Sequence, residues 1–70
     1  MDFSEKVKFV RGKLLLSQIA LAKKIGISNV TINRWEVKKI KPSFLAEKKF
    51  YTFCEKNGIK FEDNKKWKQI

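Results

Sequence analysis

Residues 18–36 read QIALAKKIGISNVTINRWE, and the pattern predicts two short helices joined by a tight turn. The first helix is expected over residues 18–25 and ends at Gly26, a residue that adopts positive φ readily. The second helix is expected over residues 29–36, with Ser28 before it as a candidate N-cap. The segment therefore has the order helix, tight turn, helix.

Each of these two helices carries apolar residues on one face. Leu21, Ala22 and Ile25 share a face of the first helix. Ile32 and Trp35 share a face of the second. Because Ala22 is small, the two helices can cross closely. These features together indicate a helix-turn-helix motif.

The motif resembles the helix-turn-helix of the Cro/lambda-repressor (XRE) family of transcriptional regulators. The residues that carry the resemblance are, in chain order, Gln18, Leu21, Ala22, Ile25, Gly26, Ile27, Ser28, Thr31, Ile32, Arg34, Trp35, Glu36, Lys41, Pro42 and Ser43. The chain departs from the family at Lys38, where a glycine usually follows the second motif helix. We expect either a strained conformation at Lys38 or a second helix that runs on slightly.

Two further helices are expected around the motif. Ser4 is the candidate N-cap of the first helix, which should end near Gly12 or Lys13. Its apolar stripe consists of Phe3, Val7, Val10 and Leu14. The last helix is expected over residues 44–56, with Ser43 as its cap. With these helices, the resemblance implies an all-α fold, a compact lambda-repressor-like DNA-binding domain of four to five helices.

The end of the chain has a different pattern. Residues 59–62 alternate between apolar and polar side chains, and residues 66–70 could pair back on them in a short C-terminal β-hairpin. We therefore expect a helix-turn-helix DNA-binding domain over residues 1–58 and a C-terminal strand or tail over residues 59–70. The tail is a possible dimerisation element, because a two-stranded hairpin alone is marginally stable.

Composition limits the class of protein. The chain has 70 residues, enough for one domain with a small core. It has no histidine and a single cysteine, Cys54, so we expect no intrachain disulfide, no metal site and no cofactor. No run of 18 apolar residues is present, so no membrane span is expected. The first residues also lack the apolar run of a secretory signal, and the expected location is the cytoplasm.

The net charge is +10, with 17 basic and 7 acidic residues. Eight of the basic residues lie between Arg11 and Lys41, where Glu36 is the one acid. Such a balance favours a polyanionic partner, and nucleic acid is the commonest. Charge alone does not separate DNA from RNA or from an anionic membrane.

The outward face of the second motif helix carries the candidate base-reading residues, because Ile32 and Trp35 face inward. These are Asn29, Val30, Asn33 and Arg34. A helix of this kind enters the major groove by its N-terminal end. There asparagine can pair with adenine, arginine can pair with guanine, and valine can contact a thymine methyl.

Phosphate contacts would position the protein on DNA. The resemblance implies that Gln18, at the start of the first motif helix, touches the backbone. Lysines near the motif are further candidates for phosphate contact: Lys13, Lys38, Lys39 and Lys41. Each lysine could equally be a solvated surface residue.

The resemblance also implies a structural salt bridge between Arg11 and Glu36. The family often has arginine late in its first helix and glutamate at the end of the recognition helix, joined in a partly buried pair. Both residues stand at matching positions here.

Nothing in the sequence supports an enzyme. The first hypothesis is a homodimeric, sequence-specific regulator of transcription, most simply a repressor, that binds inverted half-sites in double-stranded DNA. The alternative is an antitoxin-type interaction protein that holds a partner protein and regulates itself through DNA binding. A third reading is a non-specific RNA or DNA chaperone.

Phe44 and Tyr51 form a second aromatic pair. Either the tail covers this pair or a dimer contact uses it.

Overall fold

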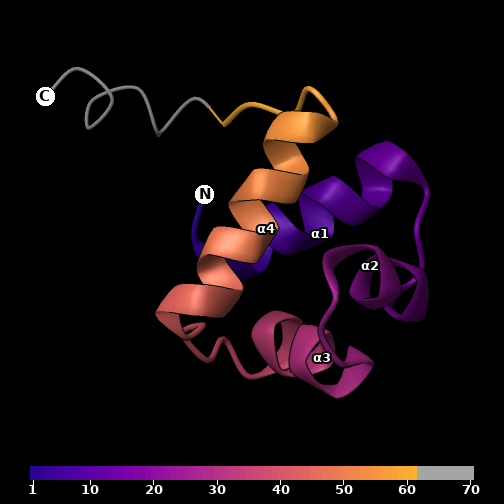
Figure 1. Cartoon of the computed structure of the whole chain (residues 1–70). Helices are drawn as coiled ribbons and strands as arrows, with labels where there is room; N and C mark the ends of the chain where they lie inside the picture. The colour runs from indigo at the N-terminus through magenta and orange to yellow at the C-terminus, as the bar shows by residue number, and fades with distance from the viewer. Residues whose placement is uncertain (62–70) are drawn as a thin grey trace, which may run out of the picture.

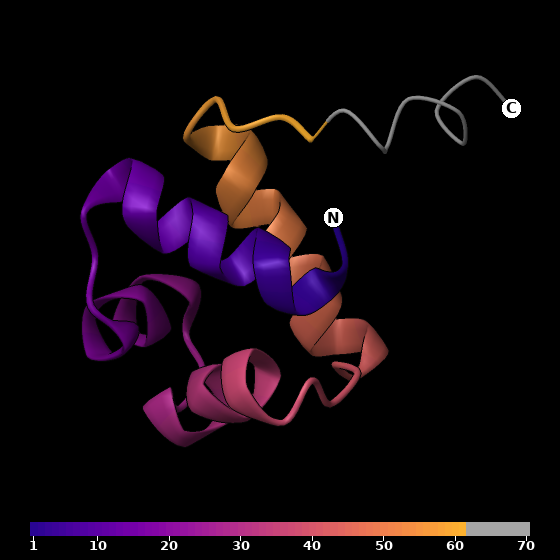
Figure 2. The ribbon, with the colours of Figure 1, turned by 180° about the vertical axis from the view of Figure 1, so that it is seen from behind.

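The computed structural model describes residues 1–61, which form four α-helices and no strand. The helices are α1 (Phe3–Leu14), α2 (Gln18–Ile25), α3 (Asn29–Val37) and α4 (Phe44–Lys56). In Figure 1, α1 and α4 cross in the upper part of the molecule, and α2 and α3 lie below them. Figure 2 shows the same arrangement from behind, with α1 in front of α4. The predicted all-α fold of four to five helices is confirmed, with four helices in the described residues.

Both motif helices begin where the sequence predicts, and α2 also ends there, whereas α3 runs one residue further, to Val37. Ser17 Oγ accepts a hydrogen bond from the backbone N–H of Ala20, at 3.0 Å, and caps α2. Ser28 Oγ accepts one from the N–H of Thr31, at 3.1 Å, and caps α3. Between them Gly26 has a φ of 90° and ends α2 in the left-handed region.

Helix α1 differs from expectation at its start. Asp2, not Ser4, is the N-cap, and it forms a reciprocal capping box with Glu5. Ser4 instead lies inside the helix, buried, and its hydroxyl donates a 3.0 Å hydrogen bond to the backbone carbonyl of Glu36 in the last turn of α3. Ser4 therefore satisfies a carbonyl that α3 cannot bond within itself.

The end of α1 also differs. The helix passes Gly12 and Lys13 and ends at Leu14, and its C-cap is Leu15 with φ 56° and ψ 47°. This left-handed conformation costs a non-glycine residue roughly 1–2 kcal/mol. The side chain gains little in return, because Leu15 is 91% exposed.

We expect Leu15→Gly to stabilise the protein by about 0.5–1 kcal/mol, because glycine adopts the left-handed cap without steric cost. The measurement is the free energy of unfolding in urea. Leu14→Gly is the matched control, since Leu14 is helical and partly buried against the core, and this variant should be destabilised. A Leu15→Gly variant that is less stable than the wild type would contradict the strain argument.

The core lies where all four helices meet. Its buried apolar residues are Val7, Val10, Leu21, Ala22, Ile25, Ile32, Trp35, Phe50, Cys54, Ile59 and Phe61. Phe50 from α4 is central, and the ring centroids of Phe3 and Trp35 lie 5.0 Å and 6.4 Å from its own. Trp35 in turn packs edge-on against Phe3, at 5.0 Å. The aromatic cluster thus joins α3 to α1 and α4.

The segment that follows α4 contributes to this core. Ile59 and Phe61 are buried, whereas Lys60 between them is exposed. Phe61 stacks on Phe50 and packs edge-on against Tyr51, with ring centroids at 6.5 Å and 6.2 Å. The first residues of the expected tail are therefore part of the domain core. Residues 59–61 form no strand, and the rest of the expected β-hairpin lies outside the described residues.

The buried Lys6 of α1 faces the same aromatic residues. Its Nζ donates a 3.1 Å hydrogen bond to the hydroxyl of Tyr51. It also lies 5.3 Å and 5.2 Å from the ring centroids of Tyr51 and Phe61, within cation–π distance. Tyr51 is therefore covered by α1 and Phe61, whereas Phe44 is 82% exposed, and the two do not form one surface patch.

Burial raises the pKa of the Cys54 thiol to about 11, with Lys6 opposing the shift and Glu55 adding to it. The thiolate is the reactive form, so we expect Cys54 to resist iodoacetamide in the folded protein at pH 8 and to react after unfolding in urea. Mass spectrometry of the alkylated chain measures this. Equal rates in the two states would mean that the thiol is accessible.

Candidate nucleic-acid interface

Helix α3 presents one face to solvent and one to the core. Ile32 and Trp35 are 0% and 2% exposed, and they hold the helix against its neighbours. The four candidate base-reading residues lie on the outward side and are all exposed: Asn29, Val30, Asn33 and Arg34. Their side chains offer two amides, one guanidinium and one apolar contact, the set of groups that recognises base edges.

The structure brings Arg11 and Glu36 together in a two-pronged salt bridge. Arg11 Nε lies 2.6 Å from Glu36 Oε2, and Arg11 Nη2 donates to Oε1 at 2.9 Å. Arg11 Nη1 also donates to the backbone carbonyl of Leu16, at 3.1 Å. The Glu36 side chain is 4% exposed and that of Arg11 is 27% exposed. The pair therefore connects α1, the start of the motif and the end of α3 while retaining partial contact with water.

The ionised forms of both groups are favoured in the folded protein. Burial acts to raise the pKa of Glu36, but hydrogen bonds from Arg11 and Gln18 and the charges of Arg11 and Lys8 outweigh it, so the pKa is lowered. The hydrogen bond to Glu36 raises the pKa of Arg11, against a smaller effect of burial. Glu36 is therefore a carboxylate at neutral pH.

Gln18 extends this salt bridge to the surface of α3. Its Nε2 donates to Glu36 Oε1 at 3.1 Å, and its Oε1 accepts a 3.3 Å hydrogen bond from Asn33 Nδ2. A continuous chain of hydrogen bonds thus runs from Arg11 through Glu36 and Gln18 to a candidate base-reading residue. Because a side-chain amide has two N–H donors, Gln18 has a second donor besides the one that bonds Glu36.

Sequence reasoning missed this network. It placed Gln18 at a helix start and Asn33 on an outward face, but it treated each as an independent contact. The signal that could have found the network is the crossing of α2 and α3, which the small Ala22 indicates. That crossing brings side chains 15 residues apart in the chain within hydrogen-bond distance.

The connection after α3 follows one of the two expected paths. Lys38 has φ −96° and ψ −4° and continues the right-handed turn, so the helix runs on. The left-handed residue is Lys39, one position later, with a φ of 54°. The expected strain at Lys38 is therefore absent, and the chain turns at its neighbour.

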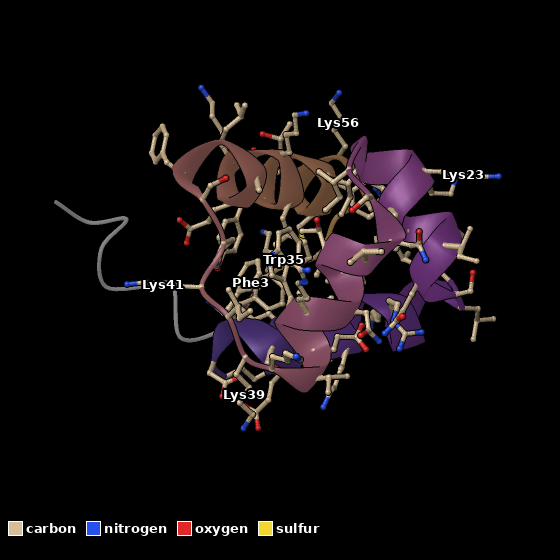
Figure 3. The ribbon with its side chains drawn as sticks, turned by 90° about the horizontal axis from the view of Figure 1, so that it is seen from below. Phe3, Lys23, Trp35, Lys39, Lys41 and Lys56 are labelled. Atoms are coloured by element: carbon tan, nitrogen blue, oxygen red, sulfur yellow. The ribbon has the colours of Figure 1, made fainter. Side chains whose placement is uncertain are left out.

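The candidate phosphate-contact lysines Lys13, Lys38, Lys39 and Lys41 are all exposed. In a view onto α3, Lys39 and Lys41 point outward from the connection after the helix, and Lys23 of α2 points outward on the opposite side (Figure 3). Lys39 Nζ also lies 4.0 Å from Asp2 Oδ2, in a solvent-exposed pair. Lys13 lies apart from this group, in the last turn of α1.

Other kinds of site find no support within residues 1–61. No group of three or more histidine, cysteine, aspartate or glutamate side chains in this range could hold a metal ion. None of the four described helices is long and apolar enough to cross a membrane. The surface of α3 and its flanking lysines is the candidate functional site.

A comparison with protein families supports this choice. The model of a family described as helix-turn-helix matches residues 7–46, which is 40 of the 70 residues. The matched region begins in α1, includes all of α2 and α3, and ends in α4. No curated protein and no solved structure matches the chain.

Proposed function

The chain belongs to the XRE-type helix-turn-helix family of DNA-binding transcription regulators, and on this basis we propose that it is a sequence-specific, dimeric repressor. It inserts α3 into the major groove of double-stranded DNA and reads an inverted repeat. The observation that carries the proposal is the exposure of Asn29, Val30, Asn33 and Arg34 on one face of α3.

The positions of the charges support this orientation. Lysines lie on both sides of α3, with Lys39 and Lys41 on one side and Lys23 on the other (Figure 3). The phosphates of the two DNA strands likewise lie on the two sides of the major groove. Gln18 begins α2, where free backbone N–H groups and the positive end of the helix dipole attract a phosphate. Phosphate contacts at both sides would place the reading face of α3 over the bases.

The size of the reading surface supports a dimer. One recognition helix contacts only a few base pairs, and two related copies that bind half-sites about 34–36 Å apart double the length of the sequence read. Repression is the simplest activity for such a dimer, because a protein bound over a promoter blocks transcription without a further domain. A regulator of this kind acts in the cytoplasm.

Selection of duplexes from a random DNA pool, near physiological salt, tests the proposal. We expect an inverted repeat to be enriched, with its spacing set by the two copies of α3. Enrichment of a single half-site would overturn the dimer but keep the specific reader. No enrichment at all, with binding that disappears as salt rises, would leave only the charge and overturn the proposed function.

The salt dependence of DNA binding separates phosphate contacts from solvated lysines. We expect Lys41→Gln to reduce the slope of log K against log [salt] by about 0.9 per protomer, because each phosphate contact releases counterions. Lys60→Gln is the matched control, since it removes the same charge from the segment after α4. Equal slopes in the two variants would exclude Lys41 as a specific phosphate contact.

The antitoxin-type alternative stays a prediction. It differs from the proposal by requiring a protein partner that purifies with the chain in a defined ratio, and its DNA binding would serve autoregulation.

A further inference from the structure

An open groove between α2 and α4 stands apart from the proposed DNA-binding surface. Its volume is about 370 Å³. The residues that line it are Lys24, Ile25, Leu45, Lys48, Lys49, Thr52, Phe53 and Lys56. None of them is among the residues assigned to DNA contact. We propose that this groove binds an acidic amphipathic helix of a partner protein.

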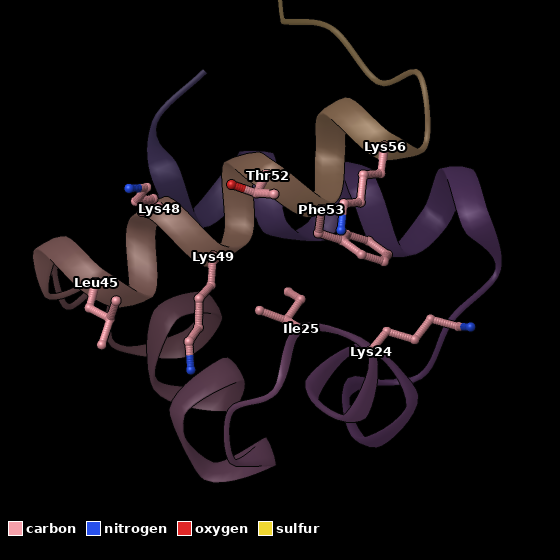
Figure 4. A pocket seen from close by; sticks show the side chains of 8 residues that line it. All are labelled: Lys24, Ile25, Leu45, Lys48, Lys49, Thr52, Phe53 and Lys56. Atoms are coloured by element: carbon pink, nitrogen blue, oxygen red, sulfur yellow. The ribbon is translucent and has the colours of Figure 1, made fainter.

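The floor of the groove is apolar. Ile25 of α2 and Phe53 of α4 lie between the two helices, and Leu45 lies at one end (Figure 4). Leu45 is 62% exposed, so most of its side chain is available for an apolar contact. Such a floor suits aliphatic or aromatic side chains of a docked helix, which anchor at i, i+3, i+4 and i+7.

The rim of the groove is basic. All three lysines of α4, Lys48, Lys49 and Lys56, line the groove, and Lys24 of α2 lines it as well. The two acids of α4, Glu47 and Glu55, do not line it. Charge is therefore segregated around α4, and the groove carries four cations and no anion. A helix with carboxylates beside its apolar stripe complements this surface.

The length of the groove also fits a helix. On α4 the lining residues run from Leu45 to Lys56, a distance of about 16 Å at 1.5 Å per residue. Three turns of a docked helix span the same length. One lysine already shows how the rim engages an oxygen: Lys49 Nζ lies 3.5 Å from the backbone carbonyl of Gly26 at the end of α2.

A second copy of this chain is a poor occupant. None of the four described helices has a negative net charge, and the only acid of α3, Glu36, is buried against Arg11. Duplex DNA is also a poor occupant, because its charged phosphates gain nothing from contact with the apolar side chains of the floor. An acidic amphipathic helix of a partner protein complements both the basic rim and the apolar floor.

The test uses the full chain and a synthetic helical peptide of about 15 residues, stapled because a free helix of this length is marginal. The peptide has leucines at i, i+4, i+7 and glutamates beside them. Its control has the same composition but leucines spread around the helix. We expect saturable binding of the first peptide alone, with NMR shift changes at Ile25, Leu45 and Phe53. Equal binding of both peptides would mean charge attraction without a site and would overturn the proposal.

Three variants locate the site. We expect Lys48→Glu to weaken peptide binding about fivefold, because reversal turns one attraction into a repulsion. Lys60→Glu makes the same change of charge outside the groove and should have a smaller effect, below about twofold. Leu45→Ala should also weaken binding. If the variants at 48 and 60 are equal, the groove is not the binding site.

Duplex DNA is measured with the same variants. The proposal expects Lys48→Glu and Lys60→Glu to change DNA affinity equally. A selective loss of DNA affinity in Lys48→Glu would place the groove in the DNA interface and overturn the proposal. Because the peptide is measured without DNA, this result is independent of whether the proposed repressor function holds.

Discussion

Arg11→Met is expected to lower the free energy of unfolding by about 3–5 kcal/mol at neutral pH, because it leaves the buried Glu36 carboxylate without its partner. Glu36→Gln is expected to cost less, about 2 kcal/mol. The reason for the difference is burial: the Arg11 side chain is 27% exposed and can turn to water, whereas that of Glu36 is 4% exposed. Urea unfolding of the two variants at pH 7 measures it. A larger loss in Glu36→Gln would contradict this account.

The same pair makes stability depend on pH. The pKa of Glu36 is lowered from an ordinary value of 4.5, so folding favours the ionised form. Its contribution is therefore complete above about pH 4.5 and is lost as pH falls through the lower, folded-state pKa. We expect the stability difference between wild type and Glu36→Gln to shrink below pH 4.5. A difference that stays constant down to pH 3 would show that the pKa of Glu36 is not lowered.

DNA binding should weaken with stability in both variants. Glu36 accepts hydrogen bonds from Arg11 and Gln18, and Gln18 accepts one from Asn33. Arg11→Met removes the salt bridge that holds the carboxylate, and Glu36→Gln replaces the carboxylate with a neutral amide. Either change therefore disturbs the position of Gln18 and, through it, of Asn33. Affinity measured well below the melting temperature separates this effect from unfolding. Lys60→Gln, far from the network in the chain, is the control for a general effect of charge.

Arg34→Ala is expected to weaken specific DNA binding by about 2–6 kcal/mol in the dimer, from about 1–3 kcal/mol in each half-site. Arg34 is exposed on the outward face of α3, and its guanidinium can bond both acceptors of one guanine. The result should be specific to position: the variant tolerates any base where the wild type requires one. Binding to a set of operators with single substitutions measures this pattern.

The control for Arg34 is Lys41→Ala, which also removes one positive charge. A phosphate contact carries no sequence information, so this variant should weaken binding to all the operators alike. If Arg34→Ala also weakens all of them alike, Arg34 contacts phosphate and the proposed reading set is wrong at this residue.

The local parts of the fold were predictable because their signals act over a few residues. Ser28 caps a backbone N–H three positions away, and Gly26 supplies the left-handed conformation where the helix ends. The family resemblance added the Arg11–Glu36 pair, whose members lie 25 residues apart. Spacing alone could not have identified that contact.

The predictions of where α1 begins and ends were wrong where two neighbouring residues could each take the same capping position. Ser4 and Asp2 are both good N-caps, and Asp2 prevails because Glu5 completes its capping box while Ser4 reaches α3. Gly12 offered a natural helix end, but burial of the apolar stripe carries α1 on to Leu14. A local rule cannot decide such cases, because the outcome depends on packing against another helix.

The packing of Phe61 has a consequence for biosynthesis. The ribosome makes the motif before it makes Phe61. The ring of Phe61 packs against Phe50 and Tyr51 of α4 in the hydrophobic core. Small domains of this kind fold as one unit. A nascent chain that has reached Gly58 contains the whole reading helix but not the residues that complete its support. Because this folding is cooperative, we expect a chain released at Gly58 to carry the complete motif in a domain that is less stable than that of the full chain.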